Sequence, residues 1–346
     1  MQVAVVLLNW NTRHLLEQFL PEVLKYSQLP GVEVVVADNG SSDDSLSWLK
    51  KHYPVVRCIA LGKNLGFAEG YNQALAKVDA QYSVLFNSDA LPRADWLPPL
   101  IATMQKHPDA AACVPKILNL RQPGHFEYAG AAGGFIDHLG YTFCRGRIFH
   151  LAEADQGQYD EEGELFWGSG AALIVRTRLF LASGGLDPDF FAHMEEIDWC
   201  WRMKNQGWRI LYQPQSSILH LGGGTLDYQN ARKTYLNFRN NLFLLLKNQG
   251  GTRAYLLILL RFFLDFLALL NFLRQGQSAN AAAVFRAHRH FIKDFWLFYR
   301  KRQKLLPLVL KKKHHEMYRG SIVWDFFVRK KKHFSQLNFK PPGLKQ

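Results

Sequence analysis

The sequence predicts an α/β fold in which a mostly parallel sheet is flanked by helices on both faces. Short apolar runs rich in Val and Leu alternate with segments of helical spacing over the first hundred residues. These runs are almost continuously apolar, as in strands that are buried on both faces. Each run also ends in a cluster of Asn, Asp, Gly or Ser, at the edge where sheets of this kind bind their ligands.

Four strands and four helices are expected in this first part, in strict alternation. The strands are expected at residues 3–10, 32–39, 55–61 and 82–89. The helices are expected at residues 13–27, 42–53, 67–78 and 93–107. The second helix begins with Ser and Asp, which are good N-cap residues. Because parallel strands need a crossover connection and a helix supplies it, the alternation favours a Rossmann-like sheet.

The pattern becomes looser between residues 109 and 170, where Gly- and Ala-rich pieces such as YAGAAGG (128–134) interrupt it. We interpret this stretch as an excursion from the sheet. Regular spacing then returns, and a helix is expected to end at Gly207. Residues 168–187 are expected to form a strand, a helix and a turn. The helix that ends at Gly207 is expected over 195–207, and strands are expected over 208–214 and 216–224.

The charge is unevenly distributed along the chain, whose net charge is +13. Residues 247–346 contain 21 Lys and Arg but 4 Asp and Glu, whereas residues 1–246 contain 21 and 25. Such asymmetry predicts that one part of the chain meets a polyanionic surface. Basic residues interleaved with Phe, Trp and Leu favour an anionic membrane surface. Nucleic acid would use the same charges, but no segment resembles a nucleic-acid module, so nucleic acid is not expected as a partner.

Residues 254–273 are mostly apolar, interrupted by Arg261, Asp265 and Asn271. The length suffices to span a bilayer, but charges at the centre of a span are costly. We therefore expect a helix in or near the membrane interface, with Arg261 and Asp265 paired at i,i+4, and keep a true span as the alternative. The whole of 231–346 is predicted to be a basic, amphipathic, helical extension that associates with membranes.

The four cysteines are far apart and form no C-x-x-C pair, which argues against a disulfide framework or a zinc site. The N-terminus resembles a strand, so no signal peptide is expected. We therefore expect a cytoplasmic protein that is peripheral on the inner face of the cell membrane.

The polar clusters at the predicted strand ends indicate the chemistry of the site. A single carboxylate, Asp89, follows the fourth strand, which suits Mg²⁺ or Mn²⁺ when substrate phosphates supply the other ligands. Asp38, at the end of the second strand, can accept a hydrogen bond from a base. The segment NLGFAEG (64–70) offers backbone N–H groups at a helix start, where phosphate or sugar oxygens bind. The cofactor expected is Mg²⁺ or Mn²⁺, and the partner is a nucleotide-sugar donor.

Seven segments over residues 1–225 resemble, in order, the family 2 inverting glycosyltransferases, and most closely the bacterial branch that includes rhamnosyltransferases. They are LNWN, VVVADNGSSDDS, NLGFAEGYNQAL, LFNSDA, GSGAALIVR, GGLDPDFFAHMEEIDWCWRMKNQGW and SSILHLGGGT. The resemblance implies the GT-A nucleotide-diphospho-sugar transferase fold, in a catalytic domain of residues 1–230.

The resemblance also implies roles for individual residues. The donor-binding residues are Asn9 and Asn11 in the nucleotide pocket, Asp38 on the pyrimidine, Asn64, Gly66 and Asn72 in the donor loop and helix, and Asn87 and Ser88. Asn87 and Asp89 stand where the family has its D-x-D motif, with Asp89 as metal ligand. Asn replaces the first Asp, and we expect this change to weaken a ribose contact without abolishing metal binding. His220 stands where related enzymes have a second metal ligand.

The acidic cluster HMEEIDW (193–199) carries the predicted base. Inversion needs one carboxylate to take the proton of the acceptor hydroxyl. The family's acidic pair falls on Glu195 and Glu196, so Glu196 is the expected base, and Asp198 is the alternative. Trp167 and GSGAA (168–172) are expected to form the floor beneath the acceptor, with the excursion as its wall.

The predicted function is an inverting, metal-dependent glycosyltransferase of cell-surface polysaccharide synthesis. The donor is dTDP-rhamnose-like or a UDP-sugar, and the acceptor is a hydroxyl of a lipid-linked or glycan molecule. A nucleotidyltransferase is the first alternative, but NWNTRHLLEQ (9–18) lacks the glycine-rich phosphate loop that it needs. A non-catalytic, membrane-bound sugar-nucleotide scaffold is the second, and the acidic pair and Asp89 argue against it.

Overall fold

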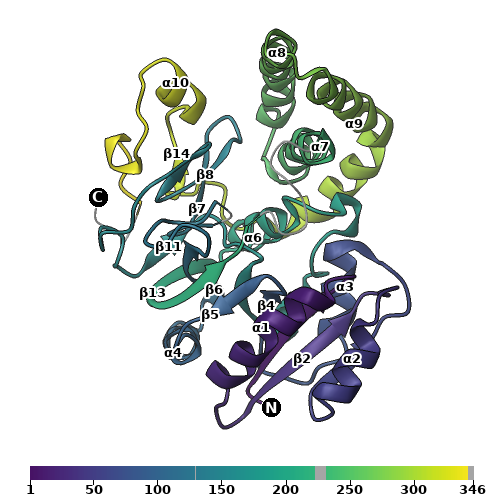
Figure 1. The fold of residues 1–346 in the computed structure, drawn as a ribbon. Helices are drawn as coiled ribbons and strands as arrows, with labels where there is room; N and C mark the ends of the chain where they lie inside the picture. Colours follow the sequence, from purple (N-terminus) through teal and green to yellow (C-terminus); the bar gives the residue numbers. More distant parts are fainter. Residues whose placement is uncertain (129, 223–230, 342–346) are drawn as a thin grey trace.

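A computed structural model of the chain describes residues 1–128, 130–222 and 231–341 (Figure 1). Its centre is a nine-stranded sheet in the order β11-β13-β6-β12-β4-β1-β2-β3, with β5 paired to β13. Its strands are β1 (Val3–Asn9), β2 (Val32–Asp38), β3 (Arg57–Ala60), β4 (Tyr82–Asn87), β5 (Ala90–Pro92), β6 (Ala110–Asn119), β11 (Gly163–Leu165), β12 (Ala172–Arg176) and β13 (Arg209–His220). The predicted α/β fold is therefore confirmed.

The sheet is mixed in direction. The neighbours β4, β1, β2 and β3 are parallel, as the alternation of strands and helices predicts. β13 is parallel to β6, whereas β12 runs antiparallel to β4 and β6, and β5 and β11 run antiparallel to β13. The register places Asn9 beside Asp38, and it places His220 beside Ala90, directly after Asp89.

Helices cover both faces of this sheet, as strands buried on both sides require. Alternate residues of β1 enter two separate cores: Val5 packs with the side chains of α1, α2 and α4, and Val6 packs with those of α3, α5 and α6. The helices are α1 (Arg13–Tyr26), α2 (Ser45–His52), α3 (Gly66–Leu75), α4 (Leu97–Lys106), α5 (Thr177–Ala182) and α6 (Glu195–Asn205), with a 3₁₀ turn, η1 (Pro188–Phe190), before α6.

A second, five-stranded sheet, in the order β10-β9-β8-β7-β14, is built from the excursion and from the C-terminal part of the chain. Its strands are β7 (Gly134–Asp137), β8 (Thr142–Cys144), β9 (Arg147–Ile148), β10 (Leu151–Ala152) and β14 (Met317–Tyr318). Phe334 and Phe339 pack against Phe135 of β7, so the end of the chain joins the core of this sheet.

The remaining helices are α7 (Ala231–Asn248), α8 (Arg253–Arg274), α9 (Ser278–Leu305) and α10 (Ile322–Phe327), with 3₁₀ turns η2 (Leu306–Leu308) and η3 (Phe334–Gln336). α7, α8 and α9 pack together, and α7 also contacts α6 (Figure 1). In the described part of the chain, α8 is the one helix long and apolar enough to cross a membrane.

The buried side of α8 carries the two charges in the middle of the helix, while Arg253 and Arg274 at its ends are exposed and the exposed side between them is mostly apolar. Arg261 and Asp265 are buried and paired at 3.4 Å, which confirms the predicted i,i+4 pair, and His288 of α9 lies 3.1 Å from Asp265. The exposed large apolar side chains of α8 are Leu256, Leu259, Leu260, Phe263, Phe266, Leu267, Leu270 and Leu273. A helix in this orientation buries its costly polar groups against protein and leaves its apolar face without a protein partner in the described chain.

Candidate active site

The polar side chains predicted to bind the nucleotide lie at the ends of β1 and β2 and bond to one another. Asn9 Nδ2 donates to Asp38 Oδ1 at 2.9 Å and to Ser41 Oγ at 3.1 Å. The other carboxylate oxygen of Asp38 accepts from the backbone N–H of Ser41 at 3.0 Å. Asn11 is in the left-handed region, with φ of 52°, and its side-chain oxygen accepts from the N–H of Ser42 at 2.7 Å. These bonds hold the loops after β1 and β2 against each other.

Asn39 organises the predicted donor loop. Its Nδ2 donates to the carbonyl of Gly66 at 3.0 Å, and its Oδ1 accepts from the N–H of Leu65 at 2.9 Å. Asn64 Oδ1 accepts from the N–H of Gly66 at 2.8 Å, and Gly66 has φ of 78°, which glycine adopts without strain. The loop therefore presents the start of α3 at the carboxyl edge of the sheet.

Asp89 and His220 meet at this same edge, from the end of β4 and the end of β13. His220 Nε2 lies 3.0 Å from Asp89 Oδ1 and 3.4 Å from Asn87 Nδ2. On its other side, His220 Nδ1 lies 3.3 Å from Glu127 Oε2. All four side chains are buried or partly buried. The sequence-predicted neighbours Asn87, Asp89 and His220 are thus brought together.

The electrostatics of this group favour an ion pair. Burial lowers the pKa of His220, but the hydrogen bond to Asp89 and the carboxylate of Glu127 outweigh it and raise that pKa to about 10. Burial raises the pKa of Asp89, but the hydrogen bond and charge of His220 outweigh it, so the pKa lies below its usual value. Negative charge therefore surrounds the imidazole from two sides.

The geometry of Asp89 and His220 fits a divalent cation. In octahedral coordination at about 2.1 Å, adjacent ligands lie about 3.0 Å apart. The separation of Asp89 Oδ1 and His220 Nε2 equals this value. Across the described residues, no group of three or more His, Cys, Asp or Glu side chains forms a metal site, so substrate oxygens would complete the coordination. Glu127 would orient the imidazole from behind, as carboxylates do for metal-bound His.

The acidic pair lies at the start of α6. Glu195 is fully buried and Glu196 is partly exposed, and Oε2 of each has no hydrogen-bond partner among the described residues. Burial, opposed by backbone hydrogen bonds, raises the pKa of Glu196 to about 7. Burial and the neighbouring charge of Glu196 raise the pKa of Glu195 well above its usual value. Perturbed pKa values of this kind are typical of catalytic acids and bases.

The donor loop and the base-bearing loop touch. The N–H of Phe67 donates to the carbonyl of Phe191 at 3.3 Å, and a Cβ added at Gly66 would lie 3.2 Å from the same oxygen. Phe191 precedes Glu195 by four residues. GSGAA (168–172) also lies here, since the carbonyl of Ala171 accepts from the N–H of Asn87 at 3.1 Å. These contacts connect the start of α3 with the loop before the acidic pair, and residues 168–172 with the end of β4 that precedes Asp89.

The chain is similar in sequence to known glycosyltransferases. Residues 4–151 match the sequence model of Glycosyl transferase family 2. The chain is 28% identical over 236 residues to N-acetylglucosaminyl-diphospho-decaprenol L-rhamnosyltransferase of Mycobacterium tuberculosis, over 63% of this chain and 75% of the relative. The chain is a glycosyltransferase, and it is similar to family 2.

Further relatives agree with this identification. Over 222 residues the glycosyltransferase is 23% identical to the low-salt glycan biosynthesis hexosyltransferase Agl10 of Haloferax volcanii, over 62% of this chain and 68% of the relative. S. aureus TarS 1–349, solved with UDP-GlcNAc, superposes with a TM-score of 0.52 at 14% identity, over 88% of this chain and 92% of that chain. GalNAc-T7, solved with UDP, GalNAc and Mn²⁺, superposes with a TM-score of 0.54 at 16% identity, over 71% of this chain and 47% of that chain. These structures support the GT-A fold.

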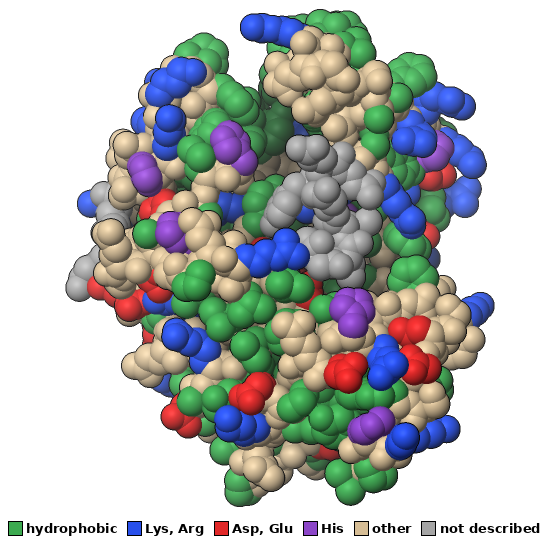
Figure 2. All heavy atoms as spheres, viewed as in Figure 1, with side chains coloured by type: hydrophobic (Ala, Val, Ile, Leu, Met, Phe, Trp, Pro, Cys, Tyr) green, Lys and Arg blue, Asp and Glu red, His purple; other side chains and the backbone are tan. Residues whose placement is uncertain are grey.

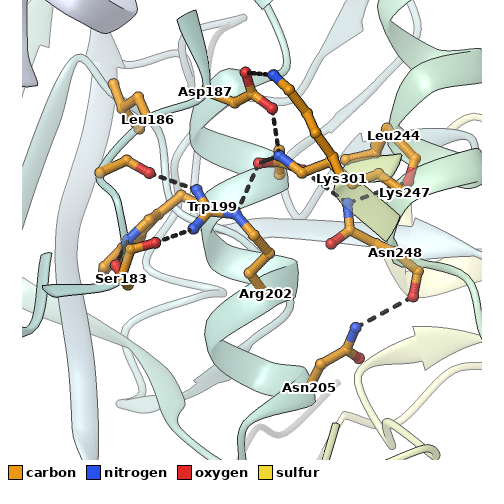
Figure 3. A network of polar contacts seen from close by, with 12 residues as sticks. Ser183, Leu186, Asp187, Trp199, Arg202, Asn205, Leu244, Lys247, Asn248 and Lys301 are labelled. Atoms are coloured by element: carbon orange, nitrogen blue, oxygen red, sulfur yellow. Dashed lines mark hydrogen bonds and ion pairs between the residues drawn. The ribbon is translucent and has the colours of Figure 1, made fainter. Parts of the chain in front are cut away.

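Asp198 of the glycosyltransferase lies in a network of buried charges, and its partners Arg202, Lys247 and Asn248 are labelled in Figure 3. Its side chain is 0% exposed. Oδ2 accepts from Lys247 Nζ at 2.8 Å and from Arg202 Nε at 2.9 Å, and Oδ1 accepts from Asn248 Nδ2 at 2.8 Å. Lys247 also contacts Asp187 at 2.6 Å. A carboxylate engaged by two cations and an amide is poorly suited to accept a proton.

Three other predicted site residues have structural partners. Both polar atoms of Asn72 bind the backbone of Leu186, at 2.8 and 2.9 Å, so Asn72 joins α3 to the loop before α6. Trp167 is buried and donates to the carbonyl of Phe135 at 2.9 Å, so it supports the acceptor side from below. Ser88 is buried, with Oγ 3.4 Å from that of a buried threonine on the first loop.

Sequence reasoning missed Glu127, Asn39 and the loop before α6. Glu127 lies in the excursion, where no periodic pattern marks it, and it meets His220 only in the fold. Asn39 belongs to the quoted segment VVVADNGSSDDS, and its position beside Asp38 is the signal that could have found it. In the loop before α6, His193 is partly exposed, with Nε2 lacking a partner in the described chain, and burial lowers its pKa to about 4.

Proposed function

We propose that this glycosyltransferase transfers a sugar from a nucleoside-diphosphate donor to a hydroxyl of a lipid-linked acceptor, with inversion at the anomeric carbon. The acidic pair at the start of α6 carries the proposal, because Glu195 and Glu196 have raised pKa values and an unpartnered oxygen each. The name of the M. tuberculosis relative supports a rhamnose donor and a diphospho-lipid acceptor. dTDP-rhamnose is therefore the first donor to test, and UDP-sugars follow, since the fold is that of S. aureus TarS, solved with UDP-GlcNAc.

Glu196 is the proposed base. Of the two acids, Glu196 is the one whose side chain is partly exposed, whereas Glu195 is buried. A carboxylate with a pKa of about 7 is half deprotonated at neutral pH and still basic enough to take a proton from the attacking hydroxyl. The hydroxyl oxygen bonds to the anomeric carbon as the bond to the nucleoside diphosphate breaks. One displacement of this kind inverts the anomeric configuration. Burial and the charge of Glu196 raise the pKa of Glu195 beside it.

Asp89 and His220 would hold a divalent cation, with the donor diphosphate completing its coordination. The cation, when bound, neutralises charge that develops on the departing diphosphate. A nitrogen ligand favours Mn²⁺ over Mg²⁺, because Mg²⁺ strongly prefers oxygen. Glu127 holds Nδ1 of His220 and so directs Nε2 towards Asp89. Asn9, Asp38 and the loop that contains Asn64 and Gly66 would bind the nucleotide.

The helical extension, residues 231–346, is the proposed membrane-binding part. The exposed face of α8 is mostly apolar while Arg261 and Asp265 are buried, and α9 exposes Phe285, Ile292, Trp296 and Leu297. Basic and apolar side chains gather on the two upper lobes in Figure 2, which carry α10 and α8. Apolar side chains flanked by Lys and Arg suit an anionic bilayer. The enzyme would then lie on the inner face of the membrane, where a lipid-linked acceptor is accessible.

A panel of nucleotide sugars tests the function. Purified enzyme is incubated with dTDP-rhamnose, UDP-sugars or GDP-sugars and an N-acetylglucosaminyl-diphospho-lipid, and the release of nucleoside diphosphate is measured. We expect turnover with at least one donor, loss of turnover on chelation and its recovery with Mn²⁺. Unchanged turnover after chelation would contradict the role of Asp89 and His220. The absence of transfer from every donor would contradict the proposed reaction.

A further inference from the structure

The loop that leads into α6 has an unusual backbone. Phe191, His193 and Met194 have φ of 67°, 67° and 75°, in the left-handed region, and none of them is glycine. Side chains disfavour this region, and strained backbone of this kind persists only where the surroundings hold it. The strain lies directly before Glu195, the first residue of α6.

Asn240 of α7 binds this loop at three carbonyls, and Arg239 of α7 also donates to the carbonyl of Phe190 at 3.0 Å. Asn240 is 0% exposed, and its Nδ2 lies 3.0, 2.9 and 2.7 Å from the carbonyl oxygens of Phe190, Ala192 and His193. Its Oδ1 accepts from Arg239 Nε at 2.9 Å, which fixes the orientation of the amide. The amide therefore gathers three carbonyls that belong to four consecutive residues.

The loop determines where the acidic pair lies. The carbonyl of Met194 accepts from the N–H of Asp198 at 2.8 Å, which starts the first turn of α6. The direction of this turn places Glu195 and Glu196. The carbonyl of Phe191, in the middle of the loop, accepts from Phe67 of the donor loop. A change in the loop would therefore move the acids relative to the donor.

We propose that Asn240 is a positioning residue for the proposed base, so that α7 is part of the active site and not only of the membrane-binding extension. The inference rests on the proposed role of Glu196. Asn240 itself touches neither donor nor acceptor in this proposal. It acts by holding the carbonyls of the strained loop, so that Glu196 faces the acceptor hydroxyl.

The neighbouring Asn241 is a matched control. It lies on the same helix, is 4% exposed and uses its side chain equally fully: Nδ2 donates to the carbonyl of Gly140 at 2.8 Å, and Oδ1 accepts from Arg261. Its partners belong to the second sheet's hairpin and to α8. Asn241→Ala therefore removes a buried amide of α7 without releasing the loop before α6.

The experiment compares full-length Asn240→Ala and Asn240→Asp with Asn241→Ala. The Asp variant keeps the shape of the side chain but, when ionised, donates no hydrogen bond. kcat and the donor KM are measured with dTDP-rhamnose and an N-acetylglucosaminyl-diphospho-lipid, well below each Tm. Amide hydrogen exchange is followed over residues 190–198. Should Asn240→Ala not fold, Asn240→Ser, which keeps one donor, takes its place in the same comparison.

For the Asn240 variants we expect kcat to fall about 100-fold, as small misplacements of catalytic groups do, with the donor KM within about twofold. Exchange over 190–198 should be faster in the Asn240 variants and unchanged in Asn241→Ala. Equal activities for Asn240→Ala and Asn241→Ala, or unchanged exchange in the loop, would overturn the inference while leaving Glu196 in place. Full turnover in Glu196→Gln would instead overturn the proposed function, and the exchange result would still report on Asn240.

Discussion

The substitution Asp198→Asn tests whether the carboxylate of Asp198 stabilises the fold or acts as the catalytic base. The carboxylate is bound by Lys247, Arg202 and Asn248 at 2.8–2.9 Å and has no exposure to solvent. An amide has the same shape but no charge, and its NH₂ group would face donors. We therefore expect Asp198→Asn to lower stability strongly and to leave the chemistry of transfer nearly intact.

The magnitude follows from the network in Figure 3. Breaking a buried ion pair costs about 3–5 kcal/mol, because the remaining charge is buried without compensation. Lys247 keeps Asp187, and Arg202 keeps the carbonyl of Ser183, so the lower half of this range is the better expectation. An unfolding entropy of about 2.1 cal/mol/K per residue gives about 0.7 kcal/mol/K for 346 residues. Tm should then fall by about 4–6 °C.

The assay combines calorimetric unfolding with steady-state transfer measured well below the Tm. Loss of a general base costs about 10²–10⁴-fold in rate, so a kcat that falls by less than about tenfold would exclude that role for Asp198. Asp79→Asn, at an exposed position, is the control and should change neither quantity. An inactive Asp198→Asn enzyme with an unchanged Tm would refute the reasoning and make Asp198 the base.

Three further predictions concern the acid, the imidazole and the membrane face. Burial raises the pKa of Glu196 to about 7, so kcat/KM should rise as the pH passes through about 7. The residual activity of Glu196→Gln should not show this rise. The same rise in that variant would contradict the assignment of Glu196 as the base. Glu127→Gln should raise the Mn²⁺ concentration that gives half-maximal activity about 10–100-fold. An unchanged concentration would show that His220 does not need Glu127 to bind the cation. Replacing Leu259, Phe263 and Leu267 together with Ser should release the protein from anionic vesicles in a sedimentation assay. The control Val55→Ser, which also changes an exposed apolar residue, should still pellet with the vesicles. If the triple variant pellets as well, this face of α8 is not the membrane-binding surface.

The pKa of Glu196 also bears on stability. A carboxyl whose folded-state pKa is raised from 4.5 to about 7 holds its proton more tightly in the folded protein than in the unfolded chain. Its contribution to stability is therefore complete below about pH 4.5 and is lost as the pH rises to about 7. Glu196→Gln cannot ionise and should not lose stability in this way. The loss is measured by comparing the free energy of unfolding of the unaltered enzyme and of Glu196→Gln over pH 5–8.

The parallel part of the sheet could be predicted because strands buried on both faces are uniformly apolar. β6 (Ala110–Asn119) could not, because it contains Pro115 and Lys116, and the lysine is buried with ion pairs to Asp155 and Asp160. β13 was expected as two strands, since Pro214 interrupts the pattern. The interruption is a register shift within one strand. The second sheet has strands of two to four residues, too short for any periodicity to indicate them.

In the site, too, residues at the ends of clear strands could be predicted, whereas contacts between distant segments could not. Asn87 and Asp89 follow a clear strand, and the resemblance supplied His220, so their meeting could be expected. The partners of Asp198 could not, because Lys247 lies 49 residues away on a helix outside the resemblance. Glu127 and Asn240 act through contacts that only the fold creates, with His220 and with the loop before α6.

The most direct measurement is the turnover of Glu196→Gln together with its affinity for the donor in the presence of Mn²⁺. An isosteric amide cannot take a proton but leaves Asp89, His220 and the nucleotide pocket in place. The account predicts a kcat lower by at least about 100-fold and a donor affinity equal to that of the unaltered enzyme. A variant that transfers sugar at the normal rate would contradict it.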